Sequence, residues 1–180
     1  MSRGMSLQKK AETKLEINVA LLGVTFTIFT LIFTLGSDLR LQDEILFELS
    51  IAIPFFLSGI TAYSNVMSYE RAVAQSEQAR NMQDRMMERW SCLAWMSYGT
   101  GFSFLVAVLG ISIYIGFDRA IWPAVLFYLI TWALGIIYGI IDVVNDPKHL
   151  WKRLQKTSYF IALEFLFGMM IILNDYYSWF

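Results

Sequence analysis

Long apolar segments, separated by short polar ones, make up most of this chain. Five helices are expected from them, at about residues 17–37, 48–69, 90–117, 120–143 and 157–174. The first four have cores without a charged side chain, and the fifth is interrupted by Glu164 alone. About 20 apolar residues, at a helical rise of ~1.5 Å each, cross the ~30 Å hydrocarbon layer of a bilayer. Because no segment has the polar face of a soluble helix, the pattern predicts an all-α integral membrane protein, a polytopic bundle of five transmembrane helices.

Positive charges are divided unevenly between the two ends of the predicted spans. The outer loops of an N-in arrangement carry only Arg40 and Arg119. The inner segments carry the other twelve of the 14 basic residues: Arg3, Lys9, Lys10, Lys14, Arg71, Arg80, Arg85, Arg89, Lys148, Lys152, Arg153 and Lys156. Short cytoplasmic loops are enriched in Lys and Arg. The predicted location is therefore the cell membrane, multi-pass, with the N-terminus cytoplasmic and the C-terminus outside.

The polar segment 70–90, between the second and third spans, is predicted to be a short cytoplasmic helical hairpin. It contains no Gly or Pro, and its apolar side chains recur at helical spacings of three and four: Ala79, Met82, Met86 and Trp90. The two flanking spans must run antiparallel, so we expect the chain to reverse near Ala79–Asn81, with Asn81 as the N-cap. The segment is either a solvated connector or a stalk that binds a cytosolic protein partner or forms oligomers.

Residues 146–156 are predicted to form a basic amphipathic helix on the inner surface of the membrane. Asp146 followed by Pro147 is typical of an N-cap and a first helical residue. Basic and aromatic side chains together suit the depth of anionic lipid headgroups. Membrane lipids are thus expected partners, and four side chains are candidates for headgroup contacts: Lys148, Trp151, Lys152 and Arg153.

One face of the first span carries small and hydroxyl side chains through the whole depth of the bilayer. Its members recur at spacings of four and three residues: Glu16, Ala20, Gly23, Thr27, Thr30 and Thr34. Small residues let helices pack closely, and threonine can bond back to its own helix. The alternative is a wet face that lines a pore, for which Glu16, Gly23, Thr27, Thr30 and Thr34 are the candidates.

Small residues in the third and fourth spans indicate seams of helix packing. In the third span, Gly99, Ser103 and Gly110 fall on one side of the predicted helix. In the fourth, Gly135 and Gly139 are separated by four residues. Small side chains at such spacings allow two helix backbones to approach each other. We therefore interpret these five residues as packing positions.

Glu164 is the exception within the apolar pattern. It lies roughly 10 Å from the inner end of the fifth span at a helical rise of ~1.5 Å per residue. Insertion scales assign an acidic residue at such depth a cost of ~2.5–3.5 kcal/mol. The carboxyl should therefore lie inside the bundle, bonded to Thr or Tyr groups of neighbouring helices or facing water. It is a further candidate for lining or gating a pore.

Composition narrows the classes of function. The chain is 57% hydrophobic, with a mean hydropathy of +0.51 and a net charge of −1, and we expect no nucleic-acid partner. Cys92 is its single cysteine and His149 its single histidine, and they lie on different segments. Catalytic and phosphate-binding motifs are missing. We therefore expect no enzyme activity, no cofactor and no metal site.

A small homo-oligomeric membrane channel or pore, passing ions, accounts best for these features. A polar face on the first span and an intramembrane carboxyl could line a pathway, and a chain of 180 residues is too small to enclose a generous one alone. The alternative is a non-conducting membrane sensor, effector or assembly subunit that binds a cytosolic partner through residues 70–90.

Overall fold

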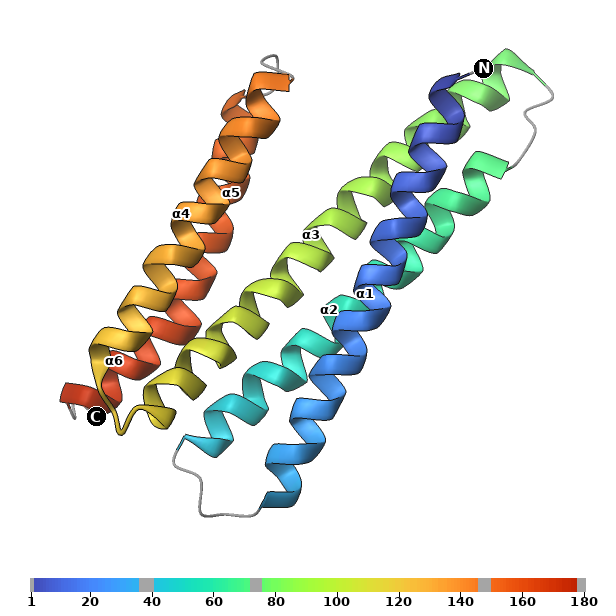
Figure 1. Ribbon diagram of the computed structural model, residues 1–180. Helices are drawn as coiled ribbons and strands as arrows, with labels where there is room; N and C mark the ends of the chain where they lie inside the picture. The colour runs from blue at the N-terminus through green and yellow to red at the C-terminus, as the bar shows by residue number, and fades with distance from the viewer. Residues whose placement is uncertain (1, 36–40, 72–75, 146–149, 178–180) are drawn as a thin grey trace. The chain divides into compact units, whose positions relative to one another are not determined.

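All the elements that the structure describes are helices. The computed structural model describes residues 2–35, 41–71, 76–145 and 150–177, with side chains at 12–34, 41–71, 76–137, 155 and 158–177. The helices, drawn in Figure 1, are α1 (Ser2–Leu35), α2 (Gln42–Arg71), α3 (Glu77–Gly116), α4 (Ile121–Asn145), α5 (Leu150–Glu164), the π-helix η2 (Phe165–Met169) and α6 (Met170–Tyr177). The prediction of an all-α chain is confirmed.

Several of these helices suit a bilayer. Four are long and apolar enough to cross one: Glu12–Thr34, Gln42–Arg71, Glu77–Gly116 and Ser158–Tyr177. A shorter apolar helix covers Ile121–Ile137, the part of α4 whose side chains are described. Because hydrocarbon offers backbone groups no water, continuous helices are the natural way for such segments to satisfy them. The helices thus suggest a membrane-embedded protein.

The reversal between α2 and α3 is not where the sequence predicted it. The helix α2 ends at Arg71 and α3 begins at Glu77, so Asn81 lies inside α3. Ser76 is the N-cap: its Oγ accepts a hydrogen bond from the Ala79 N–H at 3.1 Å, and its carbonyl accepts one from the Arg80 N–H at 3.0 Å. A serine oxygen satisfies an N–H group that has no partner in the first helical turn. Most of the predicted connector 70–90 therefore forms the first turns of a 40-residue helix.

The predicted interfacial helix at 146–156 and the predicted span at 157–174 are not separated by a break in the described residues, and which of these residues lie within the membrane stays a prediction. The helix α5 runs without interruption from Leu150 to Glu164 and continues through η2 into α6. No Gly or Pro occurs in α5, so nothing in its sequence interrupts the helical hydrogen bonds. Residues 146–149 lie outside the described part of the chain.

The chain divides into two compact units, which are taken in turn. The first comprises Met1–Thr34 and Ser50–Gly101, and the second comprises Leu35–Leu49 and Phe102–Phe180. Both α2 and α3 therefore contribute to each unit. A single transmembrane domain over residues 1–180 stays a prediction.

In the first unit, α1 packs against α2 and α3 through a buried face. The face contains Asn18, Thr25 and Ile32, which are spaced seven residues apart and so lie on one side of the helix. A Cβ atom on Gly59 of α2 would lie 2.7 Å from the Asn18 Oδ1 atom. Glycine at this position is therefore what allows the amide of Asn18 to lie against α2.

Small and aromatic residues complete the core of the first unit. Ala62 and Tyr63 of α2 and Ala94 of α3 are buried together, and Leu15 and Trp90 pack against them. On the same two helices, the Ser97 hydroxyl donates a hydrogen bond to the Ser58 hydroxyl at 3.2 Å. Near the reversal, Gln83 of α3 donates to the carbonyl of Tyr69 in α2. These contacts hold α2 and α3 together along the length of the unit.

In the second unit, the hydroxyl of Tyr128 lies where α3, α4 and η2 meet. It donates a hydrogen bond to the Ala107 carbonyl of α3 at 3.0 Å. A Cβ atom on either Gly110 or Gly168 would overlap this hydroxyl, and one on Gly168 would also lie 3.1 Å from the Ala107 Cα atom. The helices α3 and α4 and the π-helix η2 can therefore approach one another only because positions 110 and 168 are glycine.

Gly168→Ala tests this meeting point. The added methyl group has no free volume, so we expect a loss of about 1–3 kcal/mol of stability, the usual cost of overpacking a core. The measurement is the thermal unfolding midpoint of the purified protein in detergent.

Gly135→Ala is the matched control, because a Cβ atom there would meet nothing within 4 Å. It should be neutral or slightly stabilising, since alanine favours a helix more than glycine does. Adding Tyr128→Phe to Gly168→Ala should restore part of the loss. An unchanged midpoint for Gly168→Ala would show that the three elements do not meet as described.

Candidate functional site

The face of α1 that the sequence singled out lies on the outside of the chain. Thr27, Thr30 and Thr34, here called the threonine face, are all exposed, as are Glu16 and Gly23. The buried positions 18, 25 and 32 project from the opposite side of the helix, because a residue advances by about 100° at 3.6 residues per turn. The helices of the same unit therefore leave the threonine face free.

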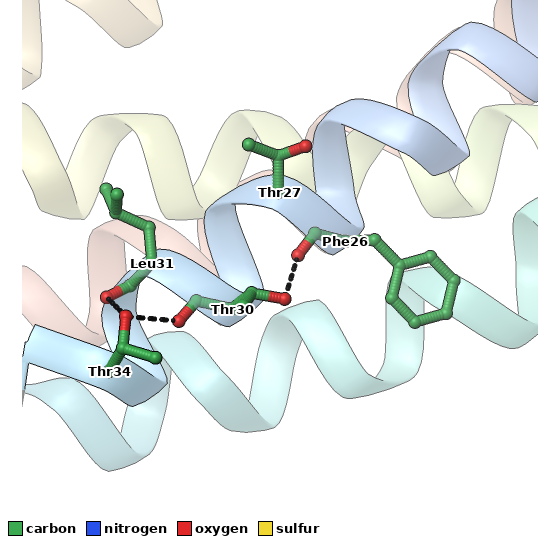
Figure 2. A pocket seen from close by; sticks show the side chains of 5 residues that line it. All are labelled: Phe26, Thr27, Thr30, Leu31 and Thr34. Atoms are coloured by element: carbon green, nitrogen blue, oxygen red, sulfur yellow. Dashed lines mark hydrogen bonds between the residues drawn. The ribbon is translucent and has the colours of Figure 1, made fainter.

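Each threonine hydroxyl on this face donates a hydrogen bond to its own helix. Thr27 donates to the Gly23 carbonyl at 2.9 Å and Thr30 to the Phe26 carbonyl at 2.8 Å. Thr34 donates to the Thr30 and Leu31 carbonyls at 2.8 and 3.0 Å, as Figure 2 shows. The hydroxyl hydrogens are thus satisfied within α1, while the hydroxyl oxygens can still accept a further hydrogen bond or contact a cation.

A shallow depression accompanies the threonine face on the surface of α1. Phe26 and Leu31 line it together with the three threonines (Figure 2), and its volume, open to the surface, is about 430 Å³. Next to it, a Cβ atom on Gly23 would meet nothing within 4 Å. All the lining residues that the structure describes come from one helix. No other helix among the described residues lines the depression, so it is open on the side away from α1.

Glu164 lies inside the second unit, as the sequence predicted for a carboxyl at that depth. Its side chain is only 6% exposed, and it accepts a hydrogen bond from the indole N–H of Trp132 in α4 at 2.8 Å. Trp132 is held in turn by Tyr128, with ring centroids 6.0 Å apart, and by Phe165 at 6.5 Å. The partner is thus an indole and not the Thr or Tyr hydroxyl that was expected.

Glu48 is a second buried carboxyl, which the sequence analysis missed. It lies in α2 and belongs to the second unit, its side chain is 0% exposed, and neither carboxyl oxygen has a hydrogen-bond partner among the described residues. The residue stands at the edge of an apolar segment, where a charge normally reaches water. The sequence did contain a signal of this burial. Glu48 lies at helical spacing from Ile45, Leu49 and Ala52, which form the buried side of α2.

The predicted packing residues differ in their surroundings. Gly110 lies beneath Tyr128, and Ser103 is buried with no hydrogen-bond partner for its hydroxyl among the described residues. Gly99 is half-buried, whereas Gly135 faces open space and makes no helix contact in the described part of the chain. The surroundings of Gly139 lie outside the described residues.

The lipid-headgroup candidates fall where side chains are not described. Trp151, Lys152 and Arg153 lie in the first turns of α5, and Lys148 lies outside the described residues altogether. Their contact with lipid stays a prediction.

The bond between Trp132 and Glu164 leads to a stability prediction. Trp132→Phe keeps a ring but removes the only N–H of the indole, so a buried carboxyl loses its donor. We expect a loss of about 1–3 kcal/mol, the usual cost of leaving a buried polar group unpaired. Thermal unfolding in detergent measures it. Trp122→Phe, on the same helix but 76% exposed, should have little effect. Equal midpoints for the two variants would show that the bond does not stabilise the protein.

The described groups bring two buried carboxyls into the second unit and leave an exposed hydroxyl face on the first. Carboxyl and hydroxyl groups can bind protons or cations, and a hydroxyl face can also pack against another helix. Comparison of the chain with protein-family models, with curated proteins and with solved structures found no match.

Proposed function

We propose that this protein is a small homo-oligomeric membrane channel whose subunits meet around the threonine face of α1 and pass ions along it. The observation that carries the proposal is the exposure of Thr27, Thr30 and Thr34 on a helix with the length and apolarity of a membrane span. The hydroxyl oxygens can still accept, and lipid offers them no donor or cation, whereas water, ions or a second copy of the helix do.

Symmetric assembly would let several copies of the threonine face surround one pathway. Thr27 and Thr34 are separated by about 10 Å along α1 at ~1.5 Å per residue, so the face extends over a third of the hydrocarbon layer. One helix cannot surround a pathway, but identical copies around an axis can, each contributing its threonines. The hydroxyl oxygens, which can still accept, would face a passing cation.

The proposed arrangement in the cell membrane has five spans, with the N-terminus in the cytoplasm and the C-terminus outside. It makes α4 a full span and puts the start of α3 on the cytoplasmic side. The distribution of Lys and Arg supports it, since twelve of the 14 fall on the inner segments. Membrane lipids would then contact Lys148, Trp151, Lys152 and Arg153 from the inner leaflet.

A non-conducting assembly or sensor subunit is the second candidate. It is favoured by the hydrogen bonds from each threonine of the face to its own helix, because such threonines suit a dry helix contact as well as a wet one. The first turns of α3 offer a surface for a cytosolic partner, since residues 76–82 are exposed and Met82 is 64% exposed.

Substitution at Thr30 separates the two candidates. We expect the wild type to form an oligomer of three or more copies and to conduct in planar bilayers. Thr30→Trp should obstruct conductance without dissociating the assembly, because its indole would fill the pathway. Thr30→Val keeps the volume, and it should reduce conductance several-fold because it removes the hydroxyl oxygen.

The control is Phe33→Trp, also at an exposed position of α1 but about 100° around the helix from the centre of the threonine face. It should conduct like the wild type. Native mass spectrometry in detergent gives the number of copies for each variant. An oligomer that never conducts, and that Thr30→Trp dissociates, would support the second candidate and exclude the channel.

Cysteine labelling checks the proposed orientation. Cys92 is exposed and free, so it is first replaced by serine. In that background, Tyr177→Cys should react with a membrane-impermeant maleimide in intact cells. Glu77→Cys, at the start of α3, should react only after the membrane is opened. Labelling of both from the same side would exclude an arrangement of five spans.

A further inference from the structure

The carboxyl of Glu48 is buried in the second unit without a hydrogen-bond partner among the described residues. Its side chain is 0% exposed. A carboxylate removed from water without a partner loses its hydration and gains nothing in return, whereas a neutral carboxylic acid loses far less. The burial of Glu48 therefore favours the form of the side chain that carries a proton.

Three polar groups of the described residues bear on the charge of Glu48, and none of them compensates a negative charge. Glu44, one helical turn earlier in α2, is itself acidic, and its charge would repel a negative charge on Glu48. From α4, the hydroxyl of Tyr128 lies within electrostatic range of both Glu48 and Glu164, but its hydrogen is bonded to the Ala107 carbonyl. Glu164, at the end of α5, is already bonded to Trp132. Each of these groups is either acidic or occupied by another partner.

Water is nevertheless close along the helix. Glu48 lies about 9 Å from the first residue of α2 at ~1.5 Å per residue. Glu44, between the two, is exposed. A proton leaving or reaching Glu48 has only one helical turn to cross before it meets a carboxyl in contact with solvent. The site is thus closed to bulk water but near enough to exchange with it.

We propose that Glu48 is a proton-binding site: a neutral carboxylic acid, enclosed in the second unit, that holds one exchangeable proton, with Glu44 as the carboxyl through which the proton reaches solvent. The proposal does not depend on conduction, because the threonine face belongs to the first unit and to a different helix. An experiment can therefore contradict the proton-binding site without contradicting the proposed channel, and the reverse.

Infrared spectroscopy of the purified protein in lipid nanodiscs at neutral pH tests the site directly. A carboxylic acid that has no hydrogen bond to its C=O absorbs at the high-frequency end of the carboxyl region, well separated from the amide bands and from carboxylates. We expect one such band in the wild type, shifting to lower frequency when H₂O is replaced by D₂O because the proton exchanges. Glu48→Gln should abolish it.

Two matched variants test whether the band belongs to Glu48 and not to another carboxyl. Glu44→Gln removes the exposed carboxyl of the same helix and should leave the band in place while slowing its shift in D₂O. Glu164→Gln removes the buried carboxyl that has a partner, and should leave both the band and the exchange rate unchanged. Persistence of the band in Glu48→Gln would overturn the assignment. Loss of the wild-type band on adding sodium at constant pH would replace the proton by a metal cation, and would also overturn it.

Stability against pH gives a second readout that needs no band assignment. An unfolded glutamate loses its proton above a pH of about 4.3, whereas Glu48 in the folded protein keeps it. The folded state then binds one proton more than the unfolded state, so stability falls as pH rises, by up to ten-fold per pH unit in the unfolding equilibrium. Glu48→Gln should remove that slope. A wild type whose stability rises over the same range relative to Glu48→Gln would show that Glu48 is ionised when folded.

Discussion

In an apolar environment, every polar group that leaves water must find a partner within the protein, and this requirement organises the whole structure. The backbone meets it by forming helices through all the described segments but a few turns. The side chains meet it locally or across helices: Thr25 bonds to the Leu21 carbonyl at 2.7 Å, and Tyr114 bonds to Asp175 at 2.8 Å. Glu48 and Ser103 depart from the rule, since neither the carboxyl of the first nor the hydroxyl of the second has such a partner among the described residues.

Small residues decide where helices can approach. In the first unit, Gly59 makes room for the amide of Asn18, and in the second, Gly110 and Gly168 make room for the hydroxyl of Tyr128. Each polar group could be buried only because the position opposite has no side chain. The polar contacts and the glycines are therefore parts of one arrangement, and replacement of either should disturb the other.

The two faces of α1 show how one residue type can serve different purposes. Thr25 and Thr27 have nearly the same hydrogen bond, each to the carbonyl four residues earlier. Thr25 is buried in the first unit, whereas Thr27 is exposed on the opposite side. The proposed channel depends on this difference, because only the exposed hydroxyl oxygens can meet an ion or a second copy of the chain.

The sequence by itself determined the properties that depend on neighbours along the chain. Apolar length and the scarcity of helix-breaking residues specified an all-helical protein with spans suited to a bilayer, and a period of three to four residues identified the threonine face. It also placed Glu164 inside the bundle, but left open whether its carboxyl meets a partner or water. Local signals were less decisive at helix boundaries, because serine and asparagine are both favoured N-caps, and the structure has Ser76 and not Asn81 in that role.

The tertiary structure alone decided which buried groups meet. Trp132 and Glu164 are 32 residues apart, and Tyr128 and Ala107 are 21 apart, so no local pattern relates them. The burial of Glu48 likewise depends on the elements packed around α2 in the second unit, and a carboxyl at the end of an apolar run looks solvent-facing until they are in place. Periodicity reports which side of a helix is apolar, but a partner and a depth of burial are properties of the packed helices.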